Sequence, residues 1–127
     1  MNSNCIEEQY ESIHSRKFFV TISNHQECGF SVRTVKRIVR SLNPSYFCLV
    51  EEYSKNGGSH MHLFVQLKAP MRLKTIKDHF PCAHVDVVNC SAPEIRSYIR
   101  KEDKFSELRA NEMIVDGSFY ETGTISG

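Results

Sequence analysis

The sequence predicts an α+β fold: a single domain in which a central antiparallel sheet of about five strands carries helices mainly on one face. Apolar and polar residues alternate in residues 17–23 and 59–67, as they do in half-buried strands. Residues 32–42 instead repeat their apolar side chains with helical spacing. Residues 54–59 are rich in Asn, Gly and Ser, which is typical of a hairpin turn between antiparallel strands.

Length and composition agree with this fold class. At 127 residues the chain has a common domain size, and we expect a loose tail over 1–15, one domain over 16–121 and a second tail over 122–127. Apolar residues form 40% of the sequence and charged residues 24%, which argues against a largely disordered chain. No apolar run reaches the roughly 20 residues that span a bilayer, and no secretory signal opens the chain. Five cysteines without a Cys-x-x-Cys pair indicate reduced thiols, so we expect a nuclear or cytoplasmic protein that is not secreted and contacts no membrane.

Strand-like segments recur along the chain, each bounded by turn residues such as Asn, Gly and Pro. We expect strands at residues 17–23, 46–53, 59–67, 84–88, 113–115 and 118–120. In the first of them, Phe18, Val20 and Ile22 form the core face. The last two flank Asp116-Gly117, a favoured turn, so we expect them to pair with each other as a hairpin.

Three helices are expected between these strands. The first spans residues 32–42, with Ser31 as its N-cap. The second is a short basic helix at residues 73–80. The third begins after Ser91, another N-cap, and Glu94 stands at the capping-box position.

Charge is distributed unevenly along the sequence. Residues 31–104 contain 13 Lys and Arg against 7 Asp and Glu, a balance of +6, whereas residues 1–30 carry −2 and residues 105–127 carry −3. A basic central region indicates a polyanionic partner on one surface. Solvated helix faces would produce the same balance, so charge alone does not decide between these interpretations.

The strand expected at residues 59–67 places two imidazoles side by side. Alternate residues share a face, so His60 and His62 lie together, opposite the apolar side chains that face the core. Two imidazoles at this spacing can both bind one divalent metal ion. Glu51 and Glu52 end the preceding strand, and the hairpin makes Glu52 a neighbour of the histidines, where a carboxylate would add a hard oxygen ligand. Two half-exposed histidines without a metal are the alternative.

The third expected helix carries a second pair of reactive side chains. Tyr98 and Lys101 are three residues apart, so we expect them to share a helical face. A phenol with a pKa of about 10 is a weak nucleophile at neutral pH, but an ammonium and a metal-activated phosphate would stabilise the phenolate. A core tyrosine beside a solvated lysine is the alternative.

In this order, the segments resemble the three motifs of rolling-circle replication initiators, the Rep proteins of small circular single-stranded DNA viruses (geminivirus and circovirus type) and related plasmids. Residues 18–24 correspond to the first motif. Glu52 and the His-x-His-x-x-x-Gln pattern of residues 60–66 correspond to the second, and the Tyr-x-x-Lys-x-Asp pattern of residues 98–103 corresponds to the third. The resemblance extends over residues 17–121.

The resemblance implies an HUH-type endonuclease and strand transferase with an RRM-like or ferredoxin-like fold. In such an enzyme Glu52, His60 and His62 hold Mn²⁺ or Mg²⁺, which polarises the scissile phosphate of single-stranded origin DNA. Tyr98 attacks that phosphate and leaves a 5′-phosphotyrosine and a free 3′-OH. Lys101 orients Tyr98 or balances charge.

The resemblance also implies DNA contacts and partners. The residues expected to contact the single-stranded loop of an origin hairpin are Thr21, Asn24, Gln66 and Arg100. No Gly-x-x-x-x-Gly-Lys-Ser/Thr phosphate loop occurs in the sequence, so we expect the helicase of many viral relatives as a separate partner or a missing domain. The expected location is the host nucleus for a virus of eukaryotes, and otherwise the cytoplasm.

Three alternatives remain open from the sequence. A non-catalytic RRM-like protein would bind single-stranded nucleic acid by stacking bases on Phe19 and Phe64. An HUH transposase or relaxase would use the same chemistry for another purpose. A metal-dependent hydrolase would use water as the nucleophile, and it would therefore form no covalent adduct with DNA.

Overall fold

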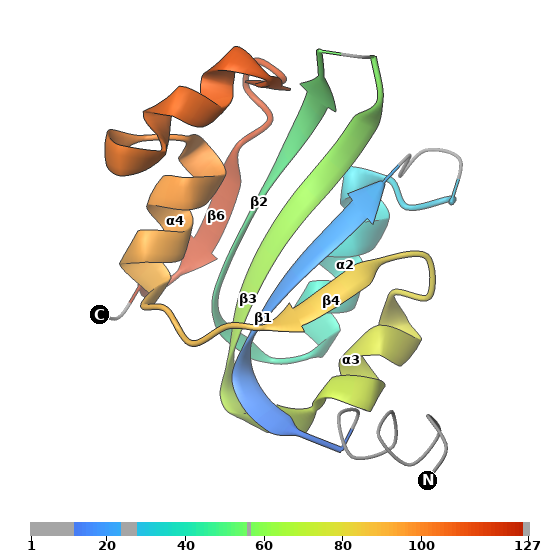
Figure 1. The fold of residues 1–127 in the computed structure, drawn as a ribbon. Coiled ribbons are helices and arrows are strands. Elements are labelled where there is room, and N and C mark those ends of the chain that lie inside the picture. The colour runs from blue at the N-terminus through green and yellow to red at the C-terminus, as the bar shows by residue number, and fades with distance from the viewer. Residues whose placement is uncertain (1–11, 24–27, 56, 126–127) are drawn as a thin grey trace, which may run out of the picture.

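A six-stranded antiparallel sheet forms the centre of the computed structural model, which describes residues 12–23, 28–55 and 57–125 (Figure 1). The strands are β1 (His14–Ser23), β2 (Pro44–Ser54), β3 (Ser59–Arg72), β4 (His84–Val87), β5 (Glu112–Ile114) and β6 (Tyr120–Gly123). Their order is β4-β1-β3-β2-β5, and β6 also pairs with β2. The predicted α+β class with a central antiparallel sheet is confirmed.

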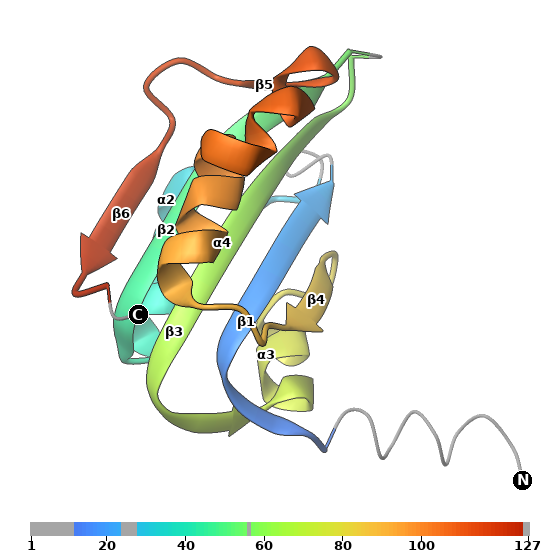
Figure 2. The ribbon, with the colours of Figure 1, turned by 60° about the vertical axis from the view of Figure 1, so that its left-hand side comes forward.

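Helices lie on both faces of this sheet. α2 (Val32–Ser41) and α3 (Leu73–His79) pack on one face, whereas α4 (Ala92–Arg100) packs on the other (Figure 2). The 3-10 helix η1 (Asp103–Ala110) follows α4 and was not predicted. Of the three α-helices in the described residues, two therefore share a face, as expected, and α4 covers part of the opposite face.

Alternation along β1, β2 and β3 divides their apolar side chains between two cores. The core beneath α2 and α3 includes Phe18, Val20, Ile22, Met61, Leu63 and Val65. The core beneath α4 includes Tyr46, Cys48, Val50, Phe64 and Ile99. The strand faces are those predicted from the sequence, but Phe64 is completely buried. It is therefore not available as the stacking platform that the RRM-like alternative assigned to it.

The pairing register of the central strands aligns the predicted site residues. Glu52 of β2 is opposite His60 of β3, and Val50 is opposite His62. On the other side of β3, Thr21 of β1 is opposite His62. Because a shift of one residue would move every side chain to the other face, this register determines which groups can meet.

The ends of several elements differ from the prediction. β1 begins at His14, within the expected tail, because residues 14 and 15 pair with the far end of β3. β3 continues to Arg72, beyond the end expected at residue 67. Residues 122–123, expected in the C-terminal tail, belong to β6. Residues 1–11 of the expected N-terminal tail lie outside the described residues.

The expected hairpin between residues 113–115 and 118–120 does not form. β5 and β6 both pair with β2, β5 at residues 52–54 and β6 at residues 46–49. The edge of the 11-residue β2 offers more unpaired backbone groups than a hairpin of two very short strands would satisfy. The two segments therefore extend the sheet along one edge.

Both predicted N-caps are present. Ser31 Oγ accepts a hydrogen bond from the Thr34 backbone N–H at 3.1 Å, and Ser91 Oγ accepts one from the Glu94 N–H at 3.4 Å. Neither these helices nor any other helix in the described ranges is long and apolar enough to cross a bilayer. The N-cap of α4 is important for the site, because it fixes where the helix that carries Tyr98 begins.

Candidate metal centre

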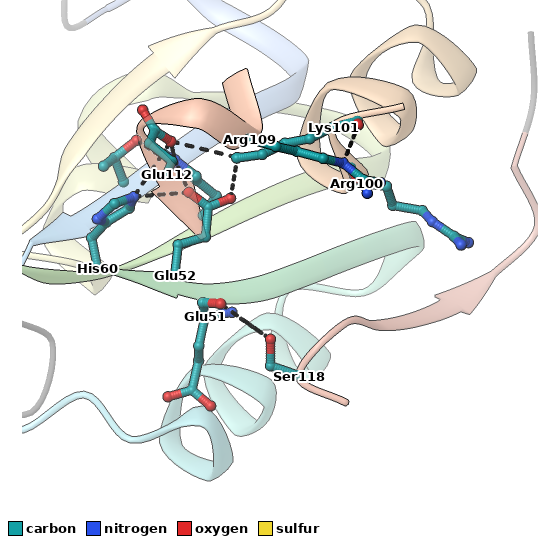
Figure 3. A network of polar contacts seen from close by, with 10 residues as sticks. Glu51, Glu52, His60, Arg100, Lys101, Arg109, Glu112 and Ser118 are labelled. Atoms are coloured by element: carbon teal, nitrogen blue, oxygen red, sulfur yellow. Dashed lines mark hydrogen bonds and ion pairs between the residues drawn. The ribbon is translucent and has the colours of Figure 1, made fainter. Parts of the chain in front are cut away.

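Two histidines and two glutamates meet on the α4 face of the sheet. The ligand atoms of Glu52, His60, His62 and Glu112 all lie within 4.8 Å of one another. Glu52 Oε1 lies 2.9 Å from His60 Nε2 and 3.4 Å from His62 Nε2. Glu112 Oε2 lies 3.8 Å and 3.9 Å from the same two nitrogens. The β2–β3 hairpin thus brings the three predicted ligands together, and β5 adds a fourth acidic side chain (Figure 3).

Of the two adjacent glutamates on β2, Glu52 lies in this cluster. Glu51 points away from it on the other side of the strand (Figure 3). Strand alternation is the reason, since consecutive side chains project to opposite faces. The sequence left the choice between Glu51 and Glu52 open.

Lys101 also lies in the cluster, although we expected it on the helical face of Tyr98. It is the C-cap of α4 and adopts a left-handed backbone conformation, with φ of 55°, so the regular helical repeat has ended there. Its buried Nζ donates a hydrogen bond to Glu52 Oε2 and lies 3.4 Å from Glu112 Oε2. The distance from Nζ to the centroid of the Tyr98 ring is 6.0 Å. The ammonium therefore contacts the carboxylates of Glu52 and Glu112.

The charge state of Glu52 follows from these contacts. Burial opposes ionisation of its carboxyl, but the interactions with His62 and Lys101 outweigh burial and lower its pKa well below the usual range. Glu52 is therefore a carboxylate at neutral pH. Glu52 and Glu112 together present two carboxyl groups to the single ammonium of Lys101.

This donor set fits a divalent cation. Imidazole nitrogens and carboxylate oxygens are ligands that suit Mn²⁺, and Mg²⁺ accepts the carboxylates. Thr21 Oγ1 lies 3.3 Å from His62 Nδ1, so it can accept the Nδ1 proton and leave Nε2 to coordinate. Glu112 Oε2 is shielded from solvent and accepts no hydrogen bond from the residues that the structure describes. A cation between these groups would satisfy that oxygen.

Tyr98 lies beside the cluster on α4. Its ring centroid is 6.3 Å from that of His62, 5.7 Å from that of Phe19 and 5.3 Å from that of Phe105. Burial raises the pKa of the phenol, and the negative charges of Glu112 and Glu52 raise it further. Tyr98 is therefore a protonated phenol at neutral pH.

A pocket of about 480 Å³ adjoins Tyr98 and His62. The half-buried ring of Phe19 forms part of its wall, and Asp86 and Asn89 add polar groups from the β4 side. The pocket therefore combines an aromatic surface with hydrogen-bonding side chains immediately beside the reactive groups.

The residues expected to contact DNA do not form one surface. Thr21 lines the pocket. Gln66 is buried at 8% exposure, farther along β3. Arg100 points away from the cluster, with its guanidinium 5.0 Å from the centroid of the Phe119 ring (Figure 3). Asn24 lies outside the described residues.

Glu112 was not among the predicted site residues. It is 60 positions from Glu52 in the sequence and belongs to no recognisable motif. Its position directly before the apolar segment 113–115 was the available signal, because that segment was expected to be a strand. The prediction paired that strand with residues 118–120, whereas β5 pairs with β2. The position of Glu112 beside the histidines could therefore not be derived from the sequence.

Fold and site together define an α+β domain with a histidine–carboxylate cluster next to a tyrosine on a helix. The sequence profile of the family described as "Putative viral replication protein" matches residues 15–102, which is more than half of the chain. The chain belongs to this family of viral replication proteins. Its membership confirms the resemblance to rolling-circle replication initiators. A search among curated proteins found no match.

Proposed function

We propose that this protein is a replication initiator endonuclease, which nicks single-stranded origin DNA and becomes covalently joined to it through Tyr98. The observation that carries the proposal is the short distance between the Tyr98 ring and the cluster of Glu52, His60 and His62, in a chain of the viral replication protein family. A nucleophile and a cation site side by side are what phosphodiester cleavage requires.

The reaction follows from these groups. A divalent cation, Mn²⁺ or Mg²⁺, held by Glu52, His60 and His62 would supply Lewis-acid polarisation of the scissile phosphate. Tyr98 Oη forms a bond to phosphorus while the bond from phosphorus to the 3′ oxygen breaks. The phenol loses one proton and the departing oxygen gains one, so the products are a 5′-phosphotyrosine and a strand with a free 3′-OH. Reversal with another 3′-OH would join strands.

Neighbouring side chains prepare Tyr98 for this attack. Phe19 and Phe105 meet the Tyr98 ring edge-on and limit its rotation. Because the pKa of the phenol is raised, Tyr98 stays protonated until the phosphate is bound. Lys101 compensates the charges of Glu52 and Glu112 while an anionic substrate approaches.

The proposed substrate is single-stranded DNA in the loop of an origin hairpin. The pocket beside Tyr98 offers the Phe19 ring, on which an unpaired base can stack, whereas the bases of a duplex are stacked on one another. Unwinding would require a helicase from a partner or from a domain outside this sequence. If the virus infects a eukaryote, we propose that the protein acts in the host nucleus.

The proposal is tested by trapping the covalent intermediate. The protein is incubated with Mn²⁺ and a pool of single-stranded oligonucleotides labelled at the 3′ end, because the protein stays on the 5′ phosphate of the 3′ fragment. We expect a labelled protein band on a denaturing gel. Tyr98→Phe should fold and bind Mn²⁺ and DNA like the parent, yet give neither the band nor cleavage.

Matched controls use other tyrosines. Tyr53 lies on β2 and faces away from the cluster, and Tyr120 lies on β6. Tyr53→Phe and Tyr120→Phe should therefore leave both the covalent adduct and cleavage intact. If Tyr98→Phe still nicks the oligonucleotides, water or another side chain is the nucleophile and the proposed mechanism is wrong.

A further inference from the structure

The segment after α4 contributes directly to the cluster. η1 and β5 form a C-terminal arm, defined here as residues 103–114, which lies beyond the region matched by the family profile, residues 15–102. The arm places Phe105 against Tyr98 and Glu112 against the two histidines. Neither side chain belongs to one of the three motifs.

The arm is fixed at both of its ends. Arg109 Nε donates a hydrogen bond to the Lys101 carbonyl at 2.9 Å, and its Nη2 donates to the Arg100 carbonyl at 3.4 Å. These are carbonyls at the C-terminus of α4, where a cation is favoured. At the other end β5 pairs with β2, with Ile114 opposite Glu52. Glu112 therefore reaches the cluster from a fixed backbone.

Glu112 Oε2 is oriented as a ligand would be. It faces His60 Nε2 and His62 Nε2 at 3.8 Å and 3.9 Å, and it is 3.4 Å from Lys101 Nζ. The atom is shielded from solvent without accepting a hydrogen bond from any described residue. The ion pair with Lys101 offsets part of the cost of shielding this oxygen, and a cation shared with the imidazoles would offset the rest.

We propose that Glu112 is a fourth ligand of the divalent metal and that Arg109 is the residue that positions it. The inference rests on the proposed function only in so far as Glu52, His60 and His62 bind a cation. A second carboxylate adds a negative charge and a hard oxygen, which suits Mn²⁺ and Mg²⁺. Metal affinity then depends on a segment outside the family-matched region.

The test is Mn²⁺ binding by the full chain without DNA, followed by the electron paramagnetic resonance signal of free Mn²⁺. Glu112→Gln keeps the shape of the side chain and removes its charge, and we expect the Kd for Mn²⁺ to rise about tenfold or more. Glu107→Gln is the matched control, because Glu107 is an exposed acid of the same arm. Its Kd should stay within about twofold of the parent value.

Arg109→Gln tests the positioning role. We expect a weaker affinity for Mn²⁺ than in the parent, and no further loss when Arg109→Gln is combined with Glu112→Gln, because both changes remove the same ligand. Additive losses would mean that Arg109 does not act through Glu112, and this part of the inference would be wrong.

His62→Ala separates failure of this inference from failure of the metal site. If the parent binds Mn²⁺, His62→Ala abolishes binding and Glu112→Gln binds like the parent, the metal site stands and Glu112 is not a ligand. If the parent does not bind Mn²⁺, or His62→Ala leaves binding unchanged, the site itself is refuted and the inference falls with it. Circular dichroism of each variant checks that it is folded.

Discussion

Lys101 illustrates how one backbone conformation determines what a side chain can contact. A residue other than glycine in the left-handed region costs about 1 kcal/mol, and glycine is usual at the end of a helix. At φ of 55° the Lys101 side chain instead reaches Glu52, whose carboxylate is completely buried. The i, i+3 spacing predicted a shared face with Tyr98, but that rule holds only inside a helix, and Lys101 is the first residue beyond it.

We predict that Lys101→Met destabilises the protein by about 3 kcal/mol, because it leaves the buried carboxylate of Glu52 without its cation. Methionine is similar in length and has no advantage or penalty over lysine in the left-handed conformation. The free energy of unfolding is measured by urea denaturation. The double variant Glu52→Gln/Lys101→Met should recover part of the loss, since neither charge remains buried.

An exposed lysine provides the control for this change. Lys104 pairs with Glu94 at the surface, and its side chain is 67% exposed. Lys104→Met should leave the free energy of unfolding close to the parent value, because solvent screens this pair. A similarly small effect of Lys101→Met would contradict the assignment of a buried ion pair.

Thr21 provides a second prediction for a single residue. Its hydroxyl contacts His62 Nδ1 at 3.3 Å, and such contacts orient ligating histidines. Thr21→Val keeps the shape and removes the hydroxyl, so we expect about tenfold weaker Mn²⁺ binding, measured by calorimetry. Thr21→Ser retains the oxygen and should stay close to the parent. Equal affinities for the valine and serine variants would show that the hydroxyl does not orient His62.

For whole helices and strands, the sequence predicts the features that are determined by residues close together in the chain. The period of two assigns the faces of β1, β2 and β3, and Ser31 and Ser91 mark the starts of α2 and α4. Glu52, His60, His62 and Tyr98 meet for this reason, since each lies on a correctly predicted element. The C-terminal strands depend on a distant partner, β2, and local turn chemistry at Asp116-Gly117 does not reveal it. Glu112 was missed with them.

Glu121 connects the last strand to the rest of the fold. Its carboxylate accepts hydrogen bonds from Arg96 of α4 at 2.8 Å and 2.9 Å and from the Tyr46 hydroxyl of β2 at 2.7 Å. Arg96 and then Tyr46 lower the pKa of Glu121 to about 2, against the opposing effect of burial. In addition to the backbone pairing of β6 with β2, this one side chain therefore links β6 to α4 and to β2.

This pKa predicts a dependence of stability on pH. A carboxyl whose folded pKa lies near 2 and whose unfolded pKa lies near 4.5 stabilises the protein above about pH 4.5, and the contribution is lost as the pH falls towards 2. Glu121→Gln should therefore lower the melting temperature at pH 6, by an amount corresponding to about 1 kcal/mol because the pair is partly exposed. The difference from the parent should be smaller at pH 3. A difference of the same size at both pH values would contradict the assignment.

In the whole molecule, the basic residues of α2 and the candidate metal centre lie on opposite faces of the sheet. α2 contains Arg33, Lys36, Arg37 and Arg40 and no acidic residue, and it packs on the face away from Tyr98. The +6 balance of residues 31–104 therefore does not describe the surface beside the reactive groups. Charge summed along the sequence cannot distinguish the two faces, because the fold separates neighbouring segments. We therefore propose that the ring of Phe19, rather than the summed charge, marks where single-stranded DNA would bind.

We predict that Phe19→Leu weakens binding of single-stranded DNA about fivefold or more, because stacking of a base on an aromatic ring contributes roughly 1–3 kcal/mol. Fluorescence anisotropy measures the affinity, in a Tyr98→Phe background that prevents cleavage. The parent should bind single strands more tightly than a perfect duplex, and its affinity should fall as salt increases. The control is Arg33→Ala/Arg37→Ala on the opposite face, which should stay within about twofold of the parent at roughly 0.15 M salt. A strong effect of the arginine pair without an effect of Phe19→Leu would place the nucleic acid over α2, and a preference for the duplex would count against an initiator that acts on single strands.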